Sequence, residues 1–184
     1  MRPWSDRPIQ DCLESLEHLP PQLFRIEPHP YALVGAPYGP GKDPFRLRST
    51  VVRRLLQAQD QLRRRAPELQ FAIFDAWRPI SVQAFMVNYT IDQLCRERGV
   101  DRHDPAQTAD LHEVESEVGR FWAPPSQNPQ TPPPHSTGAA VDLTLATDAG
   151  SLLQMGGAID AIGAVSEPDV FANCLLYTSP SPRD

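Results

Sequence analysis

The chain has 184 residues, which is the length of one domain with a core of its own. Its formal net charge of −6 argues against nucleic acid as a partner. The sequence has no apolar run long enough to span a membrane and no apolar leader, so we expect a cytoplasmic protein that does not enter the membrane. Cys12, Cys95 and Cys174 show no paired spacing, which argues against a disulfide framework and a zinc ribbon.

Residues 1–48 are rich in proline and lack long periodicity. Within them, Tyr31 to Val34 is predicted to form a short strand, and residues 35–44, with their glycines and prolines, to form a loop. His29 lies between two prolines and is also predicted to be a loop residue.

The next stretch shows a helix followed by a strand. Apolar residues at helical spacing predict a helix over 49–66, with Ser49 as its cap and Pro67 after its end. The arginines at 63–65 suit the negative end of that helix dipole, so we interpret them as structural. Residues 69–74 form a short apolar run and are predicted to be a strand that enters the core.

Two further helices are predicted before a long loop. The first covers residues 80–98 and ends at Gly99. The second covers residues 103–120, with Asp104 as its cap. Residues 123–134 carry six prolines and are expected to be a loop. Helices mixed with short, non-alternating strands indicate the α+β class.

A histidine, a glycine and an aspartate follow that loop. His135 precedes Asp142 by seven residues, and Gly138 lies between them. Asp142 belongs to an apolar run, residues 139–145, that we predict to be a buried strand. An ionised carboxylate there is costly unless it is paired or binds a metal, and imidazole with carboxylate suits Zn²⁺. The alternative is a buried aspartate that caps a turn beside a loop histidine.

A second motif, Asp75-Ala-Trp-Arg78-Pro, comes at the end of the strand predicted over 69–74. An aspartate and an arginine on either side of an aromatic residue often form a structural ion pair, and this alternative stays open from the motif alone.

Together, His135-x-x-Gly-x-Ala-x-Asp142 and Asp75-x-x-Arg78-Pro resemble the signatures of the D-alanyl-D-alanine dipeptidases and their D,D-carboxypeptidase relatives. The resemblance implies an α+β fold of the D,D-peptidase/Hedgehog-like zinc peptidase type, with a small antiparallel or mixed sheet flanked by helices. It also implies one Zn²⁺ per site, held by His135 and Asp142. Arg78 would stabilise the transition state, and we expect Asp75 to be an internal partner that orients the loop or the guanidinium.

The family also carries a late Glu-x-x-His-like segment with the third zinc ligand and the catalytic glutamate, and this chain has no such segment. The remaining histidines do not replace it: His112, which Glu113 follows, is expected at the surface, as are His18 and His103. We therefore expect the third metal-binding histidine and the catalytic glutamate to be absent from this chain.

The resemblance implies zinc-dependent hydrolysis of the D-alanyl-D-alanine dipeptide, a small substrate related to the bacterial cell wall and its peptidoglycan. A family serine two places before the histidine is replaced by Pro133, for which Ser136 or Thr137 could compensate. Two alternatives are a D,D-carboxypeptidase that acts on longer cell-wall peptides and a non-catalytic module that binds wall peptides or metal. Oligomeric state cannot be derived from the sequence.

The last eleven residues, 174–184, show no period, cap or core pattern and resemble the in-frame translation of a sequencing adapter. We therefore expect residues 1–173 to be a single zinc peptidase domain that lacks its C-terminal part, and residues 174–184 to be a non-native tail. On this hypothesis the parent protein is a zinc metallopeptidase and the chain as written is inactive.

Overall fold

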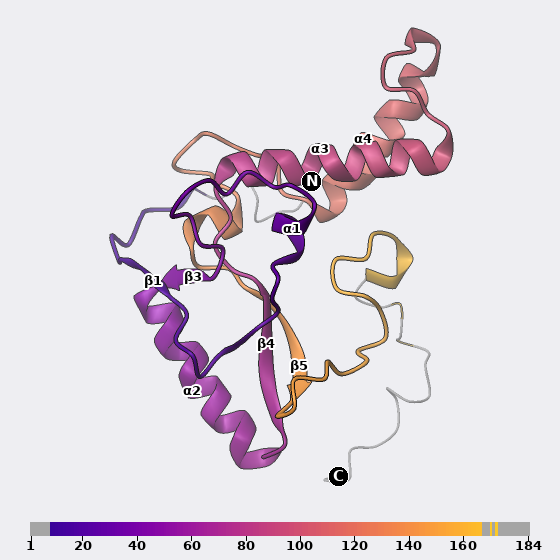
Figure 1. Ribbon diagram of the computed structural model, residues 1–184. Helices are drawn as coiled ribbons and strands as arrows, with labels where there is room; N and C mark the ends of the chain where they lie inside the picture. The colour runs from indigo at the N-terminus through magenta and orange to yellow at the C-terminus, as the bar shows by residue number, and fades with distance from the viewer. Residues whose placement is uncertain (1–7, 167–169, 171, 173–184) are drawn as a thin grey trace. The chain divides into compact units, whose positions relative to one another are not determined.

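The computed structural model describes residues 8–166, 170 and 172 (Figure 1). The tail predicted over 174–184 lies outside the described residues. The chain divides into two compact units after Leu153. The first unit carries both sheets and the α-helices described below, whereas a 3-10 helix, Ala164–Ser166, belongs to the second.

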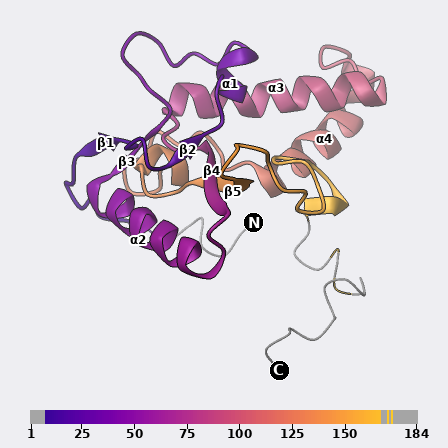
Figure 2. The same ribbon diagram turned by 60° about the horizontal axis from the view of Figure 1, so that its bottom comes forward.

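A three-stranded mixed sheet forms the centre of the first unit. Its order is β2 (Phe24–Arg25), β4 (Leu69–Asp75) and β5 (Asp142–Thr147), which lie side by side in Figure 2. β2 is parallel to β4, and β5 is antiparallel to it. β1 (Leu16–His18) and β3 (Arg46–Arg48) form a separate antiparallel pair. The small mixed sheet and the helices around it confirm the predicted α+β class.

α2 (Ser49–Arg65) joins β3 to β4 and packs its apolar side on the sheet. Its extent agrees with the predicted helix, and β4 agrees with the predicted strand. The prediction that Ser49 caps this helix is wrong, because Arg48 is the N-cap and the carboxylate of Glu14 accepts hydrogen bonds from Ser49 Oγ and Thr50 N. The apolar contacts on this side of the sheet involve Val51, Val52, Leu55, Leu56, Phe71, Ile73 and Leu143.

The strand predicted over Tyr31 to Val34 is instead a short helix, α1 (Pro30–Leu33). Pro30 occupies the first helical turn, where its missing N–H costs nothing and its fixed φ favours a helix. The turn buries Tyr31 against residues of α3 (Ile80–Arg98). An apolar run of four residues did not distinguish a strand from one turn of helix.

α3 and α4 (Thr108–Phe121) follow each other and pack together through their own apolar cluster (Figure 1). α3 has the predicted bounds and ends at Gly99, whose φ of 68° is left-handed. α4 begins later than predicted, because Asp104 caps a preceding 3-10 helix, Pro105–Gln107, rather than the α-helix itself.

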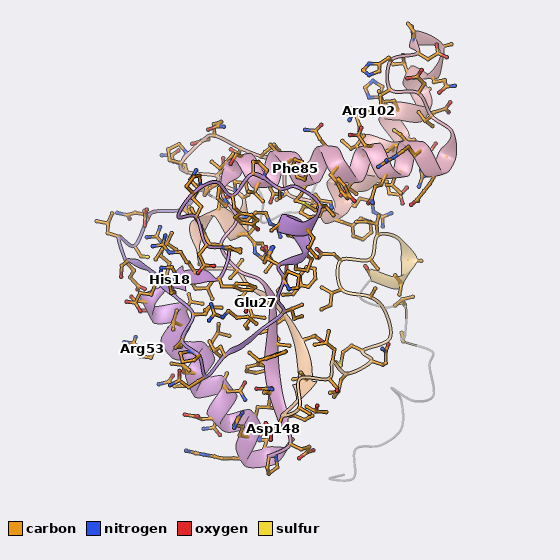
Figure 3. The ribbon with its side chains drawn as sticks, viewed as in Figure 1. His18, Glu27, Arg53, Phe85, Arg102 and Asp148 are labelled. Atoms are coloured by element: carbon orange, nitrogen blue, oxygen red, sulfur yellow. The ribbon has the colours of Figure 1, made fainter. Side chains whose placement is uncertain are left out.

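The predicted proline-rich loop follows α4 and leads to a 3-10 helix, Pro134–Thr137, just before β5. β5 ends in a turn beside the end of α2, where Arg63 contacts Asp148, which is labelled in Figure 3. Within the described part of the chain, no helix is both long enough and apolar enough to cross a membrane.

Candidate functional site

The two sequence motifs meet at one end of the β4–β5 pair. β4 ends at Asp75 and β5 begins at Asp142, and these two residues are register partners. The register shifts between Ile73 and Asp75, and an irregularity of this kind re-aims side chains at the end of a ladder. Two carboxylates are therefore placed next to each other where the sheet gives way to loops.

The 3-10 helix Pro134–Thr137 is bonded to the loop that follows β4. His135 Nδ1 lies 2.9 Å from the carbonyl oxygen of Ala76, and the backbone N–H of Arg78 donates to the carbonyl of His135 over 3.3 Å. Ser136 Oγ donates to the carbonyl of Arg78 over 2.7 Å. These three contacts hold the His135 segment against the Arg78 segment, although they lie far apart in the sequence.

Glycine is favoured at position 138, at the end of this 3-10 helix, for two reasons. Its φ of 73° is left-handed, which costs any other residue free energy. A Cβ atom at this position would also overlap the side chain of Leu16. The carbonyl of Gly138 accepts a hydrogen bond from the backbone of Arg48, so the glycine brings the His135 segment against β3.

Arg78, His135 and Asp142 lie together, as the shared motif order led us to expect. His135 Nε2 is 3.4 Å from Asp142 Oδ2, and Arg78 Nη2 is 3.7 Å from the same oxygen. The prediction that Asp142 is buried is wrong: its side chain is 38% exposed, because it is the first residue of β5 and faces the loop rather than the core. Asp142 can therefore meet a ligand from solvent.

Asp75 lies behind this group and is fully buried. Its Oδ1 accepts from His29 Nε2 at 3.1 Å and from Tyr38 Oη at 3.3 Å. Its Oδ2 lies 2.6 Å from Arg78 Nη2 and 3.2 Å from His135 Nδ1. Burial opposes the charge, but the hydrogen bonds from His135 and His29 and the charge of Arg78 hold the pKa of Asp75 far below its usual range. Asp75 is thus a charged, buried centre to which its neighbours are fixed.

Contacts with a carboxylate, an amide and two aromatic rings fix the position of the Arg78 side chain. Its guanidinium lies 5.0 Å from the ring centre of Tyr31 and 4.8 Å from that of Trp122, within the range of cation–π attraction. Its Nη1 donates to Gln83 Oε1 over 2.8 Å. Burial opposes the charge of Arg78, yet the neighbouring Asp75 raises its pKa above the usual value. The side chain is a fixed cation whose Nη2 faces Asp142.

The histidine is oriented so that one nitrogen faces inward and the other faces Asp142. Nδ1 of His135 lies against two acceptors, the carbonyl of Ala76 and the carboxylate of Asp75, so this nitrogen carries a proton. Burial lowers the pKa of His135, but the hydrogen bonds to Asp142 and Asp75 outweigh it and raise that pKa to about 9. Nε2, which faces Asp142, is the nitrogen that can bind a metal once it gives up its proton.

The two outward donors suit zinc in type and in spacing. Bonds of about 2.0–2.2 Å at a tetrahedral angle separate two ligand atoms by roughly 3.3–3.5 Å. The observed separation between His135 Nε2 and Asp142 Oδ2 is 3.4 Å. The inward Nδ1–H bonded to a carboxylate is the usual second contact of a zinc-binding histidine.

Asp75 is close enough to be counted with these two residues, and the three form the one possible metal-binding group found among the described residues. Its oxygens, however, already accept four hydrogen bonds, one each from His29 and Tyr38 and two from Arg78, and it faces Nδ1 rather than Nε2 of His135. We therefore assign Asp75 to orienting His135 and Arg78. In the described part of the chain, two outward donor atoms are present where a catalytic zinc site has three ligands.

Sequence reasoning missed several residues that surround the site. None belongs to the two motifs, and their contacts join segments far apart in the chain. His29 and Tyr31 are each next to proline in the sequence, which gave no sign that their side chains point inward. His29 contacts Asp75, and Tyr31 contacts Arg78. The missed residues are His29, Tyr31, Tyr38, Gln83 and Trp122.

Two other histidines lie at the surface, as predicted. His112 is mostly exposed on α4, and His18 is exposed beside Asp43. Ser136 and Thr137, expected as possible substitutes for the family serine, both use their hydroxyl protons within the protein, on the carbonyls of Arg78 and Pro134.

Comparison with known proteins identifies the family. Residues 9–172 match the family model described as D-ala-D-ala dipeptidase. A D-alanyl-D-alanine dipeptidase of Synechocystis sp. is 41% identical over 174 residues, which cover 93% of this chain and 69% of the relative. A crystal structure of a mutant vancomycin resistance D,D-pentapeptidase VanY, from a VanB-type resistance cassette and in complex with Zn(II), is similar with a TM-score of 0.45 and 15% identity. That likeness covers 77% of this chain, and the chain spans 57% of the VanY chain. On the family model and the Synechocystis relative, this chain belongs to the D-alanyl-D-alanine dipeptidase family of peptidases.

Proposed function

We propose that this chain carries part of the active site of a zinc-dependent hydrolase that cleaves D-alanyl-D-alanine. The observation that supports the proposal best is the outward pair formed by His135 Nε2 and Asp142 Oδ2, 3.4 Å apart, beside a fixed arginine. His135 and Asp142 would hold one Zn²⁺. When bound, the metal would polarise the peptide carbonyl and lower the pKa of a water molecule.

Arg78 is the proposed stabiliser of the transition state. Its guanidinium is permanently charged, and Asp75, Gln83 and two aromatic rings fix its position. Its Nη2 faces Asp142, so it borders the place where the substrate carbonyl would lie. A fixed donor that needs no reorganisation is what a developing oxyanion requires.

A third ligand and a general base complete a zinc peptidase site, and no glutamate or further histidine joins the pair among the described residues. We propose that both groups come from sequence that follows residue 173 in longer members of the family, as the sequence resemblance implies. The 184-residue chain would then bind zinc weakly and would not hydrolyse the dipeptide.

The position two residues before His135 supports a second candidate function. Pro133 is fully buried there, so it offers no polar group to the free amine of a dipeptide. Ser136 has its proton bound to the carbonyl of Arg78. Because these two described residues offer no group to that amine, they suit a longer peptide, whose residue at this position has no free amine. The second candidate is therefore a D,D-carboxypeptidase that trims wall peptides.

The experiment compares two proteins and two substrates. The 184-residue chain and a form extended after residue 173 with the corresponding segment of the Synechocystis relative are loaded with zinc. Release of D-alanine is then measured from D-alanyl-D-alanine and from a pentapeptide that ends in D-alanyl-D-alanine. We expect zinc-dependent release from the dipeptide by the extended form alone.

Faster release from the pentapeptide would favour the carboxypeptidase. Equal activity of both forms would refute the proposal that the missing groups follow residue 173. If the folded, zinc-loaded extended form releases no D-alanine from either substrate, the hydrolase proposal fails.

A further inference from the structure

His29 is a buried polar side chain among aromatic rings. Its side chain is 4% exposed, and its ring centre lies 5.2–5.3 Å from those of Tyr31, Tyr38 and Phe45. Nε2 contacts Asp75 Oδ1, whereas Nδ1 has no hydrogen-bond partner among the described residues. Because the ionised carboxylate only accepts, Nε2 of His29 carries the proton that it donates.

An apolar residue would suit this position better if packing were its only role. A buried nitrogen without a partner costs free energy, and the rings of Tyr31, Tyr38 and Phe45 surround the imidazole with apolar contacts. What the histidine supplies, and phenylalanine does not, is the hydrogen bond to Asp75. That bond is therefore the feature that needs an explanation.

The hydrogen bond fixes the carboxylate on the side away from the proposed metal. Asp75 uses Oδ1 for His29 and Tyr38, and Oδ2 for Arg78 and His135. If the His29 bond is lost, Oδ1 keeps only the longer contact with Tyr38 Oη at 3.3 Å, so the carboxylate is held less firmly against rotation about its last bond. Rotation would move Oδ2 and change the orientation of both the guanidinium and the imidazole ring.

The backbone conformation around His29 fixes the position of this residue. Pro30 disfavours a helical backbone for the residue before it, and His29 has the extended values φ −59° and ψ 125° as the N-cap of α1. Its carbonyl accepts a hydrogen bond from the N–H of Leu33 and closes the turn of α1. The side chain is thereby held toward Asp75 by a fixed turn.

We infer that His29 is a positioning residue: by donating from Nε2 to Asp75, it fixes the carboxylate that orients His135 and Arg78. The inference rests on the proposed function for its consequence at the metal. It goes beyond that function because His29 touches neither His135 nor Asp142 through any contact that the structure gives.

The test uses substitutions that separate the hydrogen bond from the packing. His29→Phe keeps an aromatic ring and removes the donor. His29→Gln keeps an N–H near the place of Nε2, whereas His29→Asn places its amide near Nδ1, too short to reach Asp75. His112→Phe removes an exposed histidine of α4 as a control.

Two quantities are measured on each folded variant. The first is the set of ring nitrogen and N–H proton signals of His135 in the metal-free chain, from NMR, which report the hydrogen bonding of Nδ1–H to Asp75 and to the carbonyl of Ala76. The second is the zinc affinity from competition with a chelator. We expect His29→Phe and His29→Asn to change the His135 signals and weaken zinc binding about tenfold, and His29→Gln to restore both.

Unchanged His135 signals in folded His29→Phe, or in His29→Asn should the phenylalanine variant not fold, would overturn the inference. An equal loss in His29→Gln and His29→Asn would also overturn it, because packing alone would then explain the effect. If the unsubstituted chain binds no zinc, the proposed function fails, and the His135 signals still decide the role of His29.

Discussion

At the scale of single residues, Asp75 connects the two motifs, because its carboxylate contacts both Arg78 and His135. The sequence showed Asp75 and Arg78 as a pair, and the structure adds His29, Tyr38 and His135 as further partners of the same carboxylate. Three of these contacts cross between segments that no local pattern relates. The motif residues could be predicted from the sequence, whereas the residues that hold them could not, because their positions depend on tertiary packing.

The charge of Asp75 predicts a pH dependence of stability. Its pKa is lowered from 3.8, so its contribution is present above that value and is lost as the pH falls toward the lower pKa of the folded state. At pH 6 we expect Asp75→Asn to lower the free energy of unfolding by about 3–5 kcal/mol. At pH 3 the difference between the two proteins should be smaller.

Urea unfolding of both proteins at the two pH values checks this prediction. Asp148→Asn, an exposed aspartate at the turn after β5, serves as the control. A difference that stays constant between pH 6 and pH 3 would contradict the assignment of Asp75 as a charged, buried centre.

The proposed role of Arg78 predicts a kinetic defect. Arg78→Lys keeps a positive charge beside Asp75 but loses the fork that also reaches Gln83 and Asp142. In the extended form we expect kcat to fall about a hundredfold, with a much smaller effect on zinc content. Steady-state hydrolysis and metal analysis measure the two effects, with the exposed Arg53→Lys as the control. An unchanged kcat would remove Arg78 from the reaction.

At the scale of elements, local sequence patterns predicted the long helices and the longest strand well and the short helices and strands poorly. α2, α3 and β4 agree with the sequence because their apolar patterns extend over many residues. The predicted strand at the place of α1 and the predicted start of α4 were wrong, because a single turn of helix leaves too short a pattern in the sequence. β1, β2 and β3 went unpredicted, because two or three residues become a strand only through their partners.

Gly138 shows how an element places a site residue, and it gives a testable prediction. Gly138→Ala should destabilise the protein by more than the 1–2 kcal/mol or so of a left-handed conformation, since its Cβ would also displace Leu16. Gly99→Ala is the matched control: its φ of +68° is similar, and nothing lies within 4 Å of its Cβ.

Urea unfolding gives both free energies, and zinc affinity reports on His135. We expect the larger loss of stability, and the only loss of affinity, in Gly138→Ala. Equal destabilisation by the two substitutions would show that Gly138 is needed for its backbone conformation alone.

At the scale of the whole molecule, a mixed sheet brings a strand end, a strand beginning and a proline-rich loop to one place. The resemblance gave the family and the α+β class, and the comparisons support both. Asp142 was expected to need a partner because it was thought buried. It is half-exposed, so its place beside His135 and Arg78 follows from the topology rather than from a burial penalty.

The central claim is that His135 and Asp142 bind zinc together, and zinc affinity of the 184-residue chain tests it most directly. The affinity is measured by chelator competition for the unsubstituted chain, His135→Gln, Asp142→Asn and the control Asp148→Asn. We predict weak but measurable binding of one zinc ion, at least a tenfold loss in each of the first two variants, and no change in the control. Equal binding by all four proteins, or no binding by the unsubstituted chain, would contradict the claim.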